Sequence, residues 1–142
     1  SILNDDWNIE ERSVAALDSW GLGQFPLSYP MNLLSGGEKT RVFLAGMDIH
    51  NPSVILMDEP TNHLDSSGRQ RLYDWVEKWR STLLVVSHDR TLLNLLPEIC
   101  ELEKHQISYY GGNYEFYKEQ KTLMQEALQQ RIEEKEKAPP AR

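Results

Sequence analysis

Residues 34–65 read LSGGEKTRVFLAGMDIHNPSVILMDEPTNHLD, and this stretch decides the fold of the chain. It opens with a Ser-Gly-Gly-Glu turn before a predicted helix, and it continues into the apolar run 54–57, which ends in Asp58 and Glu59. This run does not alternate between apolar and polar residues, as expected of a parallel strand buried on both faces. A second apolar run, 82–86, precedes His88. The sequence therefore predicts an α/β fold with a parallel sheet.

The carboxylates and the histidine that follow these two runs form a candidate site. Open α/β sheets bind ligands at the carboxyl ends of their parallel strands, so Asp58, Glu59 and His88 are expected at one edge. Asp58 can hold Mg²⁺, directly or through water, and Glu59 can orient and deprotonate an attacking water. His88 can contact the terminal phosphate of a nucleoside triphosphate. The pattern indicates part of a site that cleaves such a nucleotide.

The Ser-Gly-Gly-Glu turn suits a phosphate group. Ser35, Gly36 and Gly37 begin the predicted helix, so their N–H groups and the positive end of the helix dipole can face an anion. Glu38 comes three residues after Ser35 and can form a capping box with it. This structural role stands whether or not a nucleotide binds.

In this order and spacing, the motifs resemble those of the ATP-binding cassette family, and within it the ABC-F branch, over residues 21–130. LSGGE resembles the family's signature, VILMDE its Walker B strand, NHLD its D-loop, and the turn at His88 its switch-histidine loop. The segment EPTNHLD favours ABC-F over transporter cassettes, which usually carry a different triplet before the last Leu-Asp. For His63, a D-loop role and a surface turn position both stay open. The resemblance implies catalytic roles for Glu59 and His88, a Mg²⁺ contact at Asp58, and nucleotide binding by Ser35, Gly36, Gly37, Glu38 and Asp65.

The resemblance also implies a fold, a partial ABC-type P-loop NTPase. We expect a sheet with helices on both faces, part of the helical signature subdomain, and a long C-terminal helix. Residues 1–113 would form the C-terminal part of an ABC ATPase domain, in which 1–50 are the helical subdomain with the signature helix and 51–113 the sheet core. Residues 114–142 would begin a linker helix between the first cassette and a second one.

The phosphate-binding loop of such proteins is missing from this sequence. The pattern G-x-x-x-x-G-K-[ST] occurs nowhere in the 142 residues, so the P-loop strand is expected to be absent. In the family, that strand lies between the strand before His88 and the strand that begins at Ile99. A sheet without it exposes edge groups and apolar faces, which predicts partial disorder or self-association of the chain.

The remaining sequence predicts further elements. Helices are expected at 8–20, 34–50, 66–80 and 90–96, from apolar stripes and capping residues. Strands are expected at 99–103 and 106–110, and a long charged helix runs from 114 to about 137, after Gly111-Gly112-Asn113. Cys100 lies in an apolar-periodic run and is predicted to be buried.

Composition narrows the class of protein. A length of 142 residues fits one domain, and a net charge of −7 provides no basic footprint for nucleic acid. The single cysteine fits a reducing cytoplasm, and no run approaches the roughly 18 apolar residues of a membrane span.

The leading hypothesis is ATP binding and hydrolysis by a cytoplasmic ABC-F ATPase that acts on the ribosome and tRNA in translation. It requires ATP and Mg²⁺ as cofactors and a second ABC cassette as partner, and it predicts that this chain is inactive alone. Two alternatives stay open. One is the nucleotide-binding subunit of an ABC transporter, and the other is a non-catalytic interaction module with a helical arm.

Overall fold

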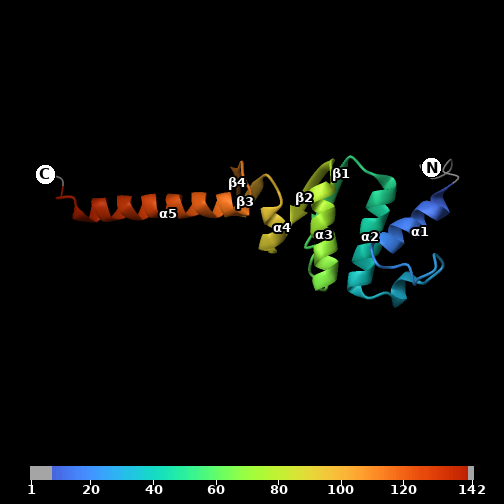
Figure 1. Cartoon of the computed structure of the whole chain (residues 1–142). Coiled ribbons are helices and arrows are strands. Elements are labelled where there is room, and N and C mark those ends of the chain that lie inside the picture. The colour runs from blue at the N-terminus through green and yellow to red at the C-terminus, as the bar shows by residue number, and fades with distance from the viewer. Residues whose placement is uncertain (1–7, 141–142) are drawn as a thin grey trace. The chain divides into compact units, whose positions relative to one another are not determined.

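The structure is a computed structural model that describes residues 8–140, and it has the mixed α/β character that the sequence predicts. The chain forms two compact units, residues 1–88 and 89–142, each with its own helices and its own two-stranded sheet (Figure 1). The predicted boundary at residue 113 is of another kind, because it separates a cassette from a linker helix by their functions. It stays a prediction.

The first unit contains most of the predicted site. Its elements are α1 (Ile9–Ser19), the 3₁₀ turn η1 (Met31–Leu33), α2 (Gly36–His50), β1 (Val54–Asp58), α3 (Ser66–Lys78) and β2 (Thr82–Val86). The helices begin and end where local chemistry requires it. The capping box forms at the start of α2: the Glu38 N–H donates to Ser35 Oγ (3.2 Å), and the Ser35 N–H donates to Glu38 Oε1 (2.8 Å). At the other end of α2, Asn51 adopts a left-handed conformation (φ 44°) just before Pro52.

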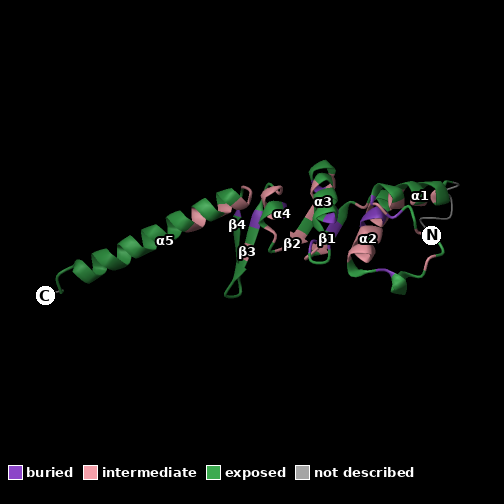
Figure 2. Cartoon of the chain, turned by 60° about the horizontal axis from the view of Figure 1, so that its bottom comes forward, coloured by how far each residue is buried: buried purple, intermediate pink, exposed green. Residues whose placement is uncertain are grey.

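The β1–β2 pair is parallel, and its register runs from Val54 opposite Thr82 to Asp58 opposite Val86. The connection between the two strands passes through α3, which lies beside them in both ribbon views (Figures 1 and 2). One face is covered: Ile55 is buried, as are Leu72 and Val76 of α3. Among the described residues of this unit, nothing covers the opposite face, which has exposed apolar side chains at Val54, Leu56, Leu84 and Val86. An uncovered apolar face is what a sheet without its P-loop strand was expected to show.

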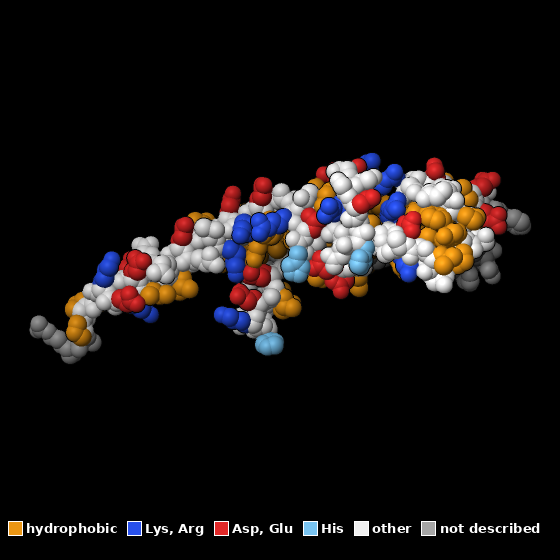
Figure 3. Space-filling view, turned by 90° about the horizontal axis from the view of Figure 1, so that it is seen from below, with side chains coloured by type: hydrophobic (Ala, Val, Ile, Leu, Met, Phe, Trp, Pro, Cys, Tyr) orange, Lys and Arg blue, Asp and Glu red, His pale blue; other side chains and the backbone are white. Residues whose placement is uncertain are grey.

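A second apolar cluster lies where α1, α2 and the segment between them meet. Trp20, Leu22, Leu44 and Ala45 are each at most 4% exposed. Further hydrophobic side chains gather on the surface at this end of the unit (Figure 3). The segment after Gly21 thus packs on two helices, and its last residues form η1.

The second unit contains α4 (Arg90–Asn94), β3 (Ile99–Glu103), β4 (Gln106–Tyr110) and α5 (Tyr114–Lys137). β3 and β4 form an antiparallel hairpin, in which Lys104 and His105 both have positive φ (50° and 63°), as in a tight two-residue turn. Its core is small and includes the buried Leu92, Ile99 and Tyr110.

The first turns of α5 are anchored to this hairpin. The Tyr117 hydroxyl donates to Glu101 Oε1 (2.6 Å), and Lys121 Nζ donates to Glu101 Oε2 (2.9 Å). The Tyr110 and Tyr117 rings meet edge to face, with centroids 4.9 Å apart. These contacts hold the pKa of Glu101 below its usual range, mainly through the Tyr117 hydroxyl, and they raise the pKa of Tyr117 to about 12. From Leu123 to the end of α5 every residue is exposed, so the helix is held only at its beginning.

The prediction that Cys100 is buried was wrong. The side chain is exposed, because it lies on the hairpin face opposite Glu101 and Tyr110. That face carries Leu102, Ile107 and Tyr109, which are also exposed, and no element of this unit covers it. The alternation of apolar and polar residues correctly placed Cys100 on the apolar face of the hairpin. It could not show that no other element covers this face.

Candidate functional site

Glu59 and His88 lie in direct contact at the carboxyl ends of the two parallel strands. Asp58 and Val86 are the last residue pair of the sheet, and the Glu59 N–H donates to the Val86 carbonyl (2.7 Å), which extends the ladder by one bond. Beyond it, Glu59 Oε1 lies 2.5 Å from Nδ1 of His88, and the His88 N–H donates to Glu59 Oε2 (3.4 Å). The topology therefore places these two predicted catalytic side chains together, although 28 residues separate them in sequence.

The backbone of Glu59 is strained. Its φ of 47° lies in the left-handed region, which costs a residue other than glycine about 1–3 kcal/mol. The bond to Val86 and a second one, from the Asn62 N–H to the Glu59 carbonyl (3.2 Å), hold the residue in this conformation. This backbone conformation follows directly after the last residue of β1, and the Glu59 carboxylate contacts His88. Strain of this kind collects at functional sites, where the surrounding structure offsets its cost.

Asp58 occupies the exposed end of β1, next to Glu59. Within residues 8–140, no group of three or more His, Cys, Asp or Glu side chains could hold a metal ion by itself. Mg²⁺ in nucleotide sites usually takes only one or two carboxylates, and phosphate oxygens and water supply the other ligands. A single carboxylate at this position fits a Mg²⁺ ion that arrives with a nucleotide.

The Ser-Gly-Gly-Glu turn packs against the segment that precedes α3. A Cβ atom on Gly36 would lie 3.1 Å from Cγ of His63, and one on Gly37 would lie 2.5 Å from the His63 carbonyl oxygen. A Cβ would be tight at Gly36 and would clash with backbone at Gly37, so the two glycines permit this close approach. His63 is exposed, and its backbone lies against the glycine turn. The adjacent glycines were the only sequence signal of this contact.

Asp65 caps α3. Its Oδ1 accepts from the Gly68 N–H at 2.7 Å, so the carboxylate lies at the N-terminus of that helix, near the glycine turn. A groove of about 600 Å³ lies between α2 and β1 and extends from His63 to the acidic residues. It is lined by Asp58, Glu59, Asn62 and His63 together with apolar side chains such as Phe43 and Met47. All eight predicted site residues belong to the first unit, where they form two clusters. The first contains Asp58, Glu59 and His88. The second contains residues 35–38 at the start of α2 and Asp65 at the start of α3, with His63 beside them.

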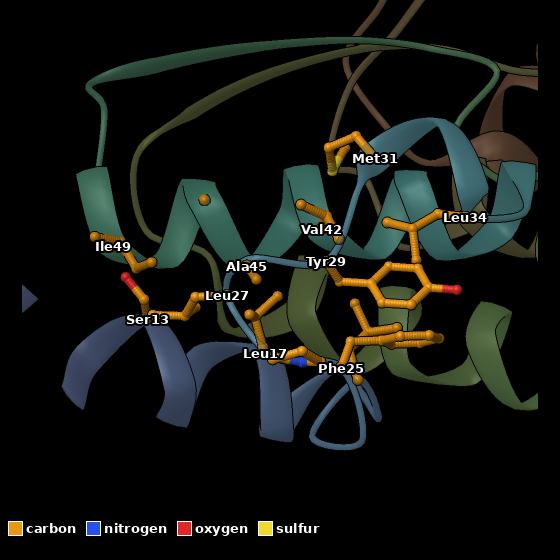
Figure 4. Close-up of a pocket in the computed structure, with 13 residues that line it drawn as sticks. Ser13, Leu17, Phe25, Leu27, Tyr29, Met31, Leu34, Val42, Ala45 and Ile49 are labelled. Carbon is orange, nitrogen blue, oxygen red and sulfur yellow. The ribbon is translucent and has the colours of Figure 1, made fainter. Parts of the chain in front are cut away.

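A second pocket in this unit differs in chemistry. It encloses about 250 Å³ between α1, α2 and the intervening segment, where apolar side chains including Leu17, Phe25 and Val42 converge (Figure 4). None of the predicted site residues lines it. It is therefore separate from the candidate site.

Comparison with known proteins agrees with this geometry. The family described as "ABC transporter" matches residues 4–62, which contain the glycine turn, the strand β1 and the two acids. Over these residues the chain resembles the ATP-binding cassette family. It matches part of a cassette of the ABC-F type, as the segment EPTNHLD predicted. In the described residues, no helix is both long and apolar enough to cross a membrane.

Several cassette relatives match most of the chain. The uncharacterized ABC transporter ATP-binding protein YkpA of Bacillus subtilis is 36% identical over 131 residues, which cover 92% of this chain and 24% of the relative. The energy-dependent translational throttle protein EttA of Mycobacterium tuberculosis is 37% identical over 118 residues, which cover 82% of this chain and 21% of the relative. The chain thus spans about a quarter of the length of these ATP-binding cassette proteins or less.

Solved cassettes share the fold. The dimeric ATP-binding cassette MJ0796, in a post-hydrolysis state bound to ADP and Pi, matches with a TM-score of 0.63 and 27% identity, over 71% of this chain and 46% of that one. The partial-cassette fold predicted from the sequence is therefore confirmed.

Proposed function

We propose that this chain supplies part of the ATP-hydrolysing site of an ABC-F protein. The observation that carries the proposal is the contact between Glu59 and His88 at the ends of neighbouring parallel strands. Glu59 is the general base, because its carboxylate is fixed by backbone strain and by His88 at a strand end where open α/β sheets bind their ligands. His88 contacts the terminal phosphate and positions Glu59.

Asp58 contributes the Mg²⁺ contact, directly or through water. Its exposed carboxylate lies one residue before the base, so a cation there lies close to the phosphate that is attacked. A bound Mg²⁺ supplies charge neutralisation of the phosphate oxygens. The strand β1 fixes the spacing between the two carboxylates.

The residues at the starts of α2 and α3 are proposed to contact a different nucleotide. Ser35, Gly36, Gly37 and Glu38 form the signature turn, and Asp65 lies at the start of α3 beside it. In a sandwich of two cassettes, we propose that these residues face the nucleotide held by the second cassette, while Asp58, Glu59 and His88 face the nucleotide of their own. The dimeric state of MJ0796 supports such a sandwich.

The surrounding protein is proposed to work in translation, in the cytoplasm, with the ribosome and tRNA as partners. The support is the relative EttA, which is named a translational throttle protein. Residues 1–113 would be the cassette part and residues 114–142 the start of a linker helix, whose exposed length from Leu123 onward leaves it available to partners.

The isolated chain is proposed to be inactive. No residue pattern here can cradle the α- and β-phosphates, because the G-x-x-x-x-G-K-[ST] motif is absent. Titration of the 142-residue chain with Mg-ATP separates an inactive fragment from a complete site. Sub-millimolar affinity would contradict this part of the proposal.

The substitution Glu59→Gln in the full-length protein tests the assignment of the general base. Removing the base should lower ATP turnover by at least about 100-fold while ATP remains bound, since binding does not need the negative charge. Glu77→Gln, at an exposed position on α3, is the matched control and should turn over at the parental rate. Parental turnover in the Glu59→Gln protein would refute the assignment.

A further inference from the structure

Asp48, which belongs to none of the motifs, binds two tryptophans from different helical elements. It lies near the end of α2, and its Oδ2 accepts from Nε1 of Trp20 at 2.9 Å, while its Oδ1 accepts from Nε1 of Trp75 at 2.5 Å. Trp20 follows α1 and is 3% exposed, and Trp75 belongs to α3. The two indole rings lie 6.3 Å apart. One carboxylate therefore joins α1, α2 and α3.

Two arginines strengthen the same junction. Arg41 of α2 donates to the Trp20 carbonyl (3.0 Å), and Arg71 of α3 donates to the Ser19 carbonyl (2.5 Å). The end of α1 is thus bound by both neighbouring helices. Gly21 follows with φ 74°, and a Cβ there would lie 3.1 Å from Nη1 of Arg41, so glycine is favoured at this turn.

The other end of α2 has its own attachment to α3. Gly36 and Gly37 pack on His63, two residues before the Asp65 cap of α3. Asp48 follows Gly37 by eleven positions, which is about 16 Å of α-helix. Contacts at both ends fix not only the distance between α2 and α3 but also the direction of α2. A contact at the glycine turn alone would leave α2 free to pivot on it.

We propose that Asp48 is a positioning residue for the signature turn: by accepting from Trp20 and Trp75, it fixes the direction of α2, and so the direction in which the free N–H groups of Gly36 and Gly37 point. The inference rests on the proposed function, in which those N–H groups meet the nucleotide of the second cassette. A carboxylate suits this task because it presents two acceptor oxygens and no donor. An asparagine of the same shape presents one acceptor and would set its NH₂ group against an indole N–H.

The test is Asp48→Asn in the full-length protein, with Asp74→Asn as the matched control. Asp74 is an exposed carboxylate on α3 that accepts from Gln70 of the same helix, so its substitution removes the same charge without touching the junction. Spin labels on His50 of α2 and Lys78 of α3, in a background without other cysteines, report the distance between the C-terminal ends of the two helices, away from the pivot at the glycine turn. Steady-state ATPase assays report kcat and KM.

We expect Asp48→Asn to broaden the label-distance distribution and to lower kcat by fivefold or more. The KM for ATP should change by less than twofold, because α2 does not hold the nucleotide of its own cassette. Asp74→Asn should leave the distances and both constants at parental values. The inference is overturned if Asp48→Asn leaves the distances unchanged, or if its kcat falls only in proportion to the fraction of protein that is folded.

The two levels of the proposal fail in different ways. Parental turnover in the Glu59→Gln protein overturns the proposed function, and with it the role given to the signature turn. Loss of turnover in that variant, together with parental distances and kcat in Asp48→Asn, overturns the positioning role of Asp48 alone.

Discussion

Two glycines on the same helix should respond in opposite directions to replacement by alanine. On α2, an alanine at Gly37 would place its Cβ 2.5 Å from the His63 carbonyl oxygen, whereas an alanine at Gly46 would meet nothing within 4 Å. Real Cβ atoms essentially never approach closer than 3.0 Å, so Gly37→Ala must move the backbone by about half an ångström or more. Overpacking of this kind costs about 1–3 kcal/mol. Gly46→Ala instead gains the helix propensity of alanine, about 0.5–1 kcal/mol.

The measurement is urea unfolding of the 142-residue chain, followed by tryptophan fluorescence, with the two variants in parallel. Both variants receive the same new methyl group on the same helix, so their difference isolates the contact with His63. We expect Gly37→Ala to lie about 1–3 kcal/mol below Gly46→Ala in free energy of unfolding. Equal stability of the two variants would refute the claim that the signature turn packs on His63.

Three further outcomes follow from other contacts. Asp65→Ala should cost about 1 kcal/mol of stability, because it leaves the Gly68 N–H without its cap, and thermal unfolding against the parent checks it. The pKa of Tyr117 is raised to about 12, mainly by its hydrogen bond to Glu101. The stability that this bond contributes is therefore full below the unfolded-state pKa of about 10 and is lost as pH rises through 12. Ultraviolet titration of the phenol at 295 nm should show that Tyr117 ionises only near pH 12. The pKa of Glu101 is lowered, mainly by Tyr117, so its contribution is present above the unfolded-state pKa and fades as pH falls below it. Glu101→Gln should bring the Tyr117 transition back toward pH 10, and a transition that stays near 12 would contradict the assignment.

Local chemistry explains why the elements could be predicted so closely. β1 is an apolar run with a Pro-containing turn before it and Asp58-Glu59 at its end, and the structure begins and ends the strand where the sequence indicates. Ser35, Asp65 and Asn113 each cap the helix that follows, because an oxygen-bearing side chain there satisfies a free N–H group. Such signals act within three or four residues, so a single sequence contains them.

Long-range contacts could not be predicted from the same information. The sequence predicted that Glu59 and His88 share an edge of the sheet, but not that the two side chains touch. The pairing of Asp48 with two indoles depends on how three helical elements pack, and no motif marks it. The error at Cys100 has the same origin, because burial depends on which element covers a face and not on the period of the strand.

The central claim is that Glu59 and His88 act as one unit on the terminal phosphate of ATP. The most direct test is kcat for Glu59→Gln, for His88→Ala and for the double variant, measured in the full-length protein. Groups that act together in one step do not lose rate independently. We predict that each single substitution lowers kcat by at least about 100-fold and that the double variant is within about threefold of the slower single one. If the two losses multiply in the double variant, the residues act separately and the account is wrong.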